Sequence, residues 1–281
     1  MPEFFLSFSL AFFISYVIHA MGIGVGYHRL LAHRSFKCPK AVEYFFVLGG
    51  YLGFQSSPLW WATMHRGHHR YSDLPQDPHA RLHGWRRAIY GWIFDKTYPE
   101  GIDPASQAKD LVDDPIYKIL DCNGDVPKAH LLNGFICFLS RFGLLYLFGL
   151  PVALGSLAAG LMMQQVTLLF NWVSHIPELG YRSFNTQDDS VNIPWLACLT
   201  FGEGFHNNHH ARPGSARSGF DKFEIDLNYV MIYTLKRVGL VGWVNDGSQS
   251  EPVIASVTVL ASEALADKKT TAAAGRGTLN P

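Results

Sequence analysis

Histidine is the residue type in this chain whose spacing most directly indicates chemistry. Nine of its 13 histidines occupy three short clusters and one isolated position. Neutral imidazole is the commonest metal ligand near neutral pH, and nine rings exceed the four ligands of a tetrahedral zinc ion. The pattern therefore predicts a site for two metal ions with nitrogen-rich ligand shells. The nine residues are His28, His33, His65, His68, His69, His175, His206, His209 and His210.

Two of the clusters share one spacing. HRGHH at 65–69 and HNNHH at 206–210 place histidines at i, i+3 and i+4, which lie on one face of a helix. His28 and His33 are separated by five residues, about 140° apart on an ideal helix, so they converge only if the helix ends or distorts between them. A single HxxHH could be a zinc site or chance, but the repeated motif argues against coincidence. The unclustered His79, His83 and His130 are predicted to have ordinary surface or supporting roles.

The ligand type leaves the metal open, because imidazole suits zinc, copper and nickel as well as iron, which is the best candidate. The four cysteines are scattered and form no CxxC motif, which argues against a disulfide framework, a thiolate site and an iron–sulfur cluster. The formal net charge is zero and no basic, aromatic-interleaved stripe is present. Composition therefore gives no support for nucleic-acid binding.

Long apolar stretches must position these histidines. Only 16% of the residues are charged, whereas about 25% is usual in soluble domains. Residues 4–27 are long enough to span a bilayer, and residues 134–174 fit two further spans, 134–153 and 155–174, folded as a hairpin. No basic residue precedes the first run, so we do not interpret it as a cleavable signal peptide. The sequence predicts an all-α integral membrane protein with three transmembrane helices.

The apolar run 41–61 lies between two histidine clusters. If both clusters bind the same metal pair, this run cannot cross the bilayer once, so it should lie along the interface or dip in and return. None of the 23 Lys and Arg residues precedes Arg29, and the positive-inside rule places the histidine face in the cytoplasm. Arg141, inside the hairpin, should snorkel or line the interior.

The predicted organisation is one membrane domain followed by a tail. The domain covers residues 1–245, with 62–130 and 176–245 forming a helical cytosolic cap that holds the histidine-rich site. The polar, Ala-rich segment 246–281 is predicted to be flexible.

Four motifs give the chain a family resemblance. They read HRxxxH from His28, HRxHHxxSD from His65, NxxxH from Asn171 and GEGxHNNHH from Gly202. At these motifs the sequence resembles the membrane fatty acyl desaturases, most closely the stearoyl-type Δ9 acyl-CoA and acyl-lipid branch with its cyanobacterial and plastid-like members. The resemblance covers about residues 10–245.

The resemblance implies roles for individual residues. The nine histidines would ligate two iron ions, and Asn171 would reach one iron through a water. Gln55, Trp61 and Thr167 match a hydrogen-bonding group that holds the bend of the acyl tunnel in that family. Asp73, Asp77 and Glu203 would be carboxylates that orient imidazole N–H groups.

The sequence also departs from the family. Members usually carry a further apolar span before the first histidine motif, so the typical four spans become three here. Nothing in the chain resembles the HPGG element of a fused cytochrome b5 domain. Electrons are therefore expected from a separate donor, a ferredoxin or a cytochrome b5-type protein.

The implied reaction is O2-dependent introduction of a cis double bond, Δ9 by default, into a saturated C16 or C18 acyl chain. The carrier, whether acyl-lipid, acyl-CoA or acyl-ACP, stays open. One alternative keeps the scaffold and ligands but changes the reaction to hydroxylation or oxidative decarboxylation of a fatty acid. Another is a non-enzymatic metal-binding membrane protein, which predicts polar residues along the spans. The spans are apolar apart from Arg141, which weakens that second alternative.

Overall fold

Three long helices dominate the computed structural model, which describes residues 1–248. They are α1 (Pro2–Met21), which continues into the wider helix η1 (Gly22–Ala32), α7 (Val126–Phe148) and α8 (Leu150–Val173). Each is long and apolar enough to cross a membrane, which confirms the three predicted membrane-length helices. The described residues contain helices and isolated bridges but no extended strand.

The bounds of these helices differ from the sequence expectation. The first helix runs beyond residue 27 to Ala32, and α7 begins at Val126 instead of residue 134. The hairpin turn lies at Gly149, not between residues 153 and 155. Gly149 has φ +83°, which glycine adopts without steric cost, and Pro151 suits the first turn of α8. The apolar sequence of residues 134–174 alone could not show which of its helix-breaking residues, Gly149 among them, forms the turn.

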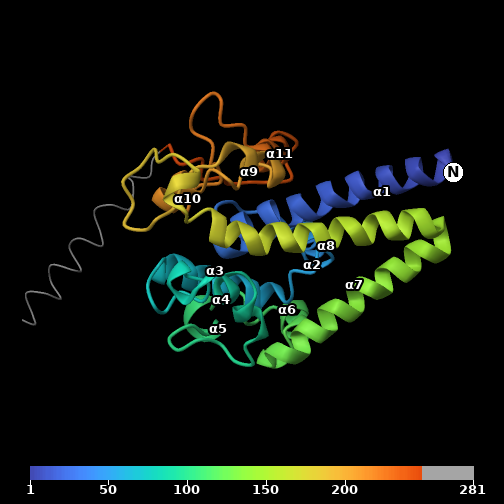
Figure 1. The fold of residues 1–281 in the computed structure, drawn as a ribbon, viewed down its shortest axis with the longest axis horizontal. Coiled ribbons are helices and arrows are strands. Elements are labelled where there is room, and N and C mark those ends of the chain that lie inside the picture. The colour runs from blue at the N-terminus through green and yellow to red at the C-terminus, as the bar shows by residue number, and fades with distance from the viewer. Residues whose placement is uncertain (249–281) are drawn as a thin grey trace, which may run out of the picture.

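The α1 and α8 helices pack side by side, and α7 diverges from α8 toward the cap (Figure 1). Arg141 of α7 is buried at this junction. Its guanidinium lies 3.1 Å from His19 Nε2 and donates to Leu52 O at 2.8 Å. Of the two roles considered for Arg141, the structure shows the interior one. His19 accordingly belongs to this polar contact and not to the metal site.

The end of the first span is wound as a π-helix. His33 N–H donates to His28 O at 3.0 Å, the i to i+5 bond that defines this wider helix. Glycines allow η1 to pack against α2 (Lys40–Tyr51), because a Cβ on Gly22 would overlap the backbone of Gly49 and Gly50. The helix therefore distorts before it reaches His33, as the spacing of the first histidine pair required.

The 41–61 run becomes two helices joined by a bend. The α2 helix has 12 residues, about 18 Å of helix, which is too short to span a bilayer. Phe54 and Ser56 in the bend have positive φ angles. Ser57 then caps α3 (Pro58–Tyr71) by accepting from Trp60 N at 3.2 Å. Whether α2 lies at the interface stays a prediction.

Short helices build the rest of the described chain on either side of α8 (Figure 1). The segment before α7 contains η2 (Arg81–His83), α4 (Trp85–Ile89), η3 (Gly91–Phe94), α5 (Pro104–Gln107), α6 (Pro115–Leu120) and η4 (Cys122–Gly124). The segment after α8 contains η5 (Pro177–Leu179), α9 (Pro194–Leu199), α10 (His206–Ala211) and α11 (Leu227–Arg237). The predicted flexible tail lies outside the described residues, apart from 246–248.

Candidate metal centre

The structure brings all nine clustered histidines together in two groups. Within each group the candidate ligand atoms lie within 4.8 Å of one another. The first group is His28, His33, His65, His69 and His209. The second group is His68, His175, His206 and His210.

Each HxxHH motif divides between the two groups. On α3, His65 and His69 belong to the first group and His68 to the second. On α10 the assignment reverses, with His209 in the first group and the i, i+4 pair 206 and 210 in the second. The shared helix face predicted from the spacing therefore serves two neighbouring sites. Residues at i and i+4 point to one site and the middle residue points to the other.

Ring nitrogens converge inside each group. His209 Nε2 lies 3.0 Å from His28 Nε2 and 2.9 Å from His69 Nε2, and His175 Nε2 lies 3.1 Å from His206 Nε2. Burial holds the pKa of His69, His206 and His209 well below the ordinary value. These rings are therefore neutral, the protonation state in which imidazole binds metals.

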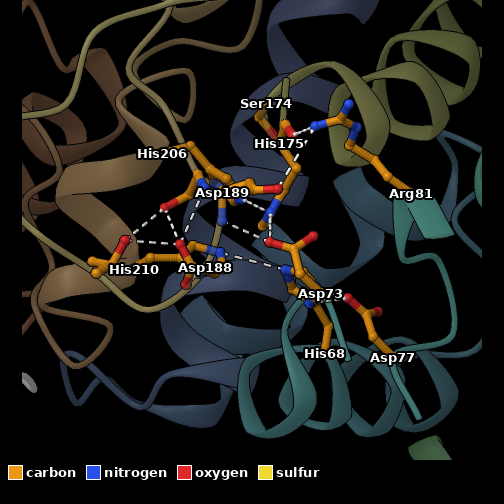
Figure 2. A network of polar contacts seen from close by, with 12 residues as sticks. His68, Asp73, Asp77, Arg81, Ser174, His175, Asp188, Asp189, His206 and His210 are labelled. Carbon is orange, nitrogen blue, oxygen red and sulfur yellow. Dashed lines mark hydrogen bonds and ion pairs between the residues drawn. The ribbon is translucent and has the colours of Figure 1, made fainter. Parts of the chain in front are cut away.

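Carboxylates fix the orientation of four of the rings, and Figure 2 shows three of these rings, His68, His175 and His210. The Nδ1 atom of each ring faces a carboxylate oxygen, so Nδ1 carries the proton and Nε2 presents its lone pair to the group. The four pairs are His28–Glu203 at 2.5 Å, His68–Asp77 at 2.9 Å, His175–Asp73 at 2.9 Å and His210–Asp188 at 2.7 Å.

This arrangement passes a test for metal binding. The Nε2 atoms of His68 and His210 lie 3.4 Å apart. Asp77 and Asp188 hold the protons of these two rings on Nδ1, so neither Nε2 can donate a hydrogen bond and the two lone pairs repel one another. A cation placed among them removes the repulsion and uses every lone pair. Nitrogen ligands without thiolates suit iron among the first-row metals. The donor set therefore fits two such ions, one in each group.

A buried ion-pair network supports the first group. Arg29 is 1% exposed and donates to Glu203 Oε1 at 3.0 Å and to Asp226 Oδ2 at 2.9 Å. Asn228 Nδ2 donates to the same Glu203 oxygen at 2.8 Å. Burial alone would raise the pKa of Glu203, but Arg29 and His28 lower it to about 2. The carboxylate that faces His28 is therefore held charged.

Three supporting residues were missed by the sequence analysis. Asp188 lies in a polar loop with no fixed spacing to any histidine, yet it accepts from His210 Nδ1 and from Ser190 Oγ. Arg29 and Asp226 are hydrophilic residues whose burial only the fold reveals. The HR pair at His28 was the one signal available for Arg29.

The three unclustered histidines have different environments. His79 is buried, with its ring 4.4 Å from that of His68 and its Nδ1 3.5 Å from Asp77. It is therefore not a surface residue, and it forms a further His68–Asp77–His79 group beside the second site. His83 is exposed, and His130 is half-buried, with Nδ1 2.6 Å from Ser56 Oγ.

A largely apolar cavity adjoins the first histidine group. Gln55, Trp61, Thr167 and Asn171 all line it together with His65. A narrower cavity shares Trp61, Thr167, Asn171 and His65 and continues to His28. The residues proposed for substrate binding thus lie along one path past the first group. A separate cleft is lined by one ring of each group, His69 and His210.

These features define a helical protein with membrane-length helices and two histidine groups, compatible with metal binding, beside an apolar cavity. A family model described as fatty acid desaturase matches residues 4–223. The chain belongs to this fatty acid desaturase family, which confirms the resemblance in its motifs.

Curated relatives agree over most of the chain. It is 37% identical over 241 residues to Delta-9 acyl-lipid desaturase 1 of Arabidopsis thaliana, covering 85% of this chain and 75% of that protein. It is 37% identical over 232 residues to the sn-1 stearoyl-lipid 9-desaturase of Anabaena variabilis, with 82% and 81% covered. It is 35% identical over 237 residues to the Acyl-CoA C20 Delta5-desaturase of Anemone leveillei, with 83% and 72% covered.

The protein is therefore an oxidoreductase that introduces a double bond into fatty acyl chains. The family assignment does not favour the hydroxylase, the decarboxylase or the non-enzymatic metal-binding protein considered from the sequence.

Proposed function

We propose that this desaturase is a diiron enzyme that uses O2 and an external electron donor to form a cis double bond at the Δ9 position of a saturated C16 or C18 acyl chain. The observation that carries the proposal is the pair of converging histidine groups beside an apolar cavity. The Δ9 position is supported by relatives named for position 9. Another relative is named for position 5. The double-bond position therefore differs among the relatives, and Δ9 is the most specific part of the proposal.

The first group would hold one iron and the second group the other, with Asn171 reaching one of them through a water. When bound, the irons supply the activation of O2 that an unactivated methylene pair requires. Overall, the acyl chain loses two hydrogens from adjacent carbons, and O2 takes up these with two electrons and two protons to give two waters. The electrons come from a ferredoxin or a cytochrome b5-type donor.

The protein's own residues position the chain. The cavity walls keep the reacting carbons beside His65 and exclude bulk water, and such orientation contributes much of a catalysed rate. Trp61 and Thr167 line both the wide and the narrow cavity, whereas Gln55 lines the wide one. We assign them to holding a bend in the acyl chain, which favours the cis product. Asp73, Asp77 and Glu203 keep their histidine Nδ1 protons in place.

The lysine and arginine distribution supports a cytoplasmic histidine face, with the N-terminus on the opposite side. On that side the histidine groups that would hold the irons would face the compartment of a soluble electron donor.

The metal content of the purified protein tests the diiron proposal. Protein from iron-replete cells should contain two irons per chain, and turnover of a stearoyl substrate should require both O2 and a reduced donor. Full turnover after the iron has been removed would contradict the proposal.

A further inference from the structure

An apolar groove lies between α1, α2 and α11, apart from the histidine groups. Its volume is about 460 Å³, and ligand pockets have volumes of roughly 300–1,000 Å³. Its lining in the described chain consists of apolar side chains and one glycine. Among the described residues, it shares no lining residue with the two cavities beside the histidines. The groove is therefore a second, separate apolar site.

The groove adjoins the exposed side of the first membrane-length helix. Val17 and Ile18, near the end of α1, line the groove and are exposed. Phe45 of α2 and Leu240, which follows α11, also line it and are exposed. Exposed apolar surface of this kind marks a site of contact with a membrane or a partner. Because the surface continues from a helix able to cross a bilayer, a membrane lipid is the occupant that its surroundings favour.

Two exposed cations flank the groove. Arg237 is the last residue of α11. Lys37 precedes α2, and its backbone bonds to Trp243 O at 2.9 Å and to Gly242 N at 3.0 Å hold it beside the segment that follows α11. Basic residues beside a membrane attract anionic head groups. The combination of an apolar groove with basic residues therefore favours an anionic lipid.

A neighbouring face of α11 supports the first histidine group. Asn228 is buried, and its Nδ2 donates to Glu203 Oε1 at 2.8 Å. Glu203 in turn faces His28. Met231 and Leu235 of the same helix line the groove. The position of α11 therefore affects both the groove and the carboxylate that orients His28.

We propose that the groove binds an acyl chain of an anionic membrane lipid, with the head group beside Arg237 and Lys37. The bound lipid holds α11 in the position in which Asn228 supports Glu203. It is a structural ligand and not the substrate, since the substrate cavity is lined by other residues. The lipid site goes beyond the proposed function, and its occupancy can be measured without turnover.

Native mass spectrometry of the full-length protein in detergent tests the head-group assignment. The anionic probe is dioleoyl phosphatidylglycerol, and dioleoyl phosphatidylcholine is the zwitterionic one. We expect the wild type to prefer phosphatidylglycerol, and Lys37→Gln/Arg237→Gln to bind it about fivefold more weakly for each cation removed. The control Lys96→Gln/Lys109→Gln removes two exposed lysines from the segment before α7 and should bind like the wild type. Equal binding of phosphatidylglycerol by the two double variants overturns the head-group assignment.

A matched pair of tryptophan variants tests the groove. Ala41 and Ala105 are both exposed second residues of a helix, but only Ala41 lines the groove. Ala41→Trp should fill the groove and lower phosphatidylglycerol binding, whereas Ala105→Trp should not. Unchanged binding by Ala41→Trp overturns the site. A lipid-free dimer that Ala41→Trp dissociates would assign the groove to a second copy of the chain and overturn the lipid.

Iron retention tests the link to the first histidine group. In nanodiscs of phosphatidylcholine alone, the wild type should lose one iron per chain at a lower chelator concentration than in discs that contain phosphatidylglycerol. Lys37→Gln/Arg237→Gln should not respond to phosphatidylglycerol. Lipid binding with equal iron retention in both discs contradicts the link. A wild type that binds phosphatidylglycerol in the groove but holds no iron in either disc contradicts the proposed function and supports the lipid site.

Discussion

Asp188 offers the sharpest test of how the second histidine group is held. Its Oδ2 lies 2.7 Å from His210 Nδ1, and its Oδ1 accepts from Ser190 Oγ and Thr186 Oγ1. Replacement by asparagine keeps the size but removes the charge. If the new amide NH2 faces His210, it disfavours a proton on Nδ1 and moves it to Nε2, where a metal needs the lone pair.

The size of the effect follows from the role of this contact. Loss of a carboxylate that orients a metal-bound histidine lowers metal affinity by about 10- to 100-fold, or roughly 1.4 to 2.8 kcal/mol. Because Asp188 contacts only the second group, we expect Asp188→Asn to weaken one of the two sites. The first group is supported by Glu203 and should keep its iron.

The assay is a chelator titration of the purified protein, with iron measured per chain at each step. Asp188→Asn should fall to one iron per chain at a chelator concentration at which the wild type retains two. Asp113→Asn is the control. The Asp113 side chain is 92% exposed, and its ion pair is with Lys118, which is not one of the histidine groups. Equal retention of both irons by wild type and Asp188→Asn would refute the reasoning.

Three further changes test other parts of the structure. His209→Ala removes a ring that contacts two others in the first group, so turnover should be abolished and the iron content should fall, as measured by product analysis and metal assay. Gly22→Ala places a methyl group on the backbone of α2 and should destabilise the protein by about 1 to 3 kcal/mol, seen as a lower melting temperature than that of Gly143→Ala. Glu203 has a pKa lowered from 4.5 to about 2, so its contribution to stability is complete above pH 4.5 and is lost as the pH falls toward 2. Arg29→Lys weakens that stabilisation and should move acid unfolding, followed by circular dichroism, to a higher pH.

The sequence was sufficient to predict the helical class and the nine histidines that converge. Apolar runs report membrane-length helices because a span needs about twenty such residues. The i, i+3 and i+4 spacings of HRGHH and HNNHH report a shared helix face. The distortion needed between His28 and His33 also followed from helix geometry, and the structure shows it as η1.

Other features depend on tertiary packing or local backbone conformation, which the sequence pattern did not resolve. The division of each HxxHH motif between two sites depends on how α3 and α10 face one another, which spacing along one helix does not report. Asp188 reaches His210 from a loop across 22 residues. Several helix-breaking residues could have formed the hairpin turn, and only the backbone conformation shows that Gly149 does. The burial of His79 depends on how the surrounding segments pack.

The central claim is tested most directly by the fatty-acid profile of a host that expresses this chain together with a competent electron donor. The double-bond position would be assigned by derivatisation and mass spectrometry, with His209→Ala expressed in parallel. The account predicts a new cis monoene with its double bond at Δ9, absent from the His209→Ala control. Hydroxylated acids, terminal alkenes or an unchanged profile would contradict it.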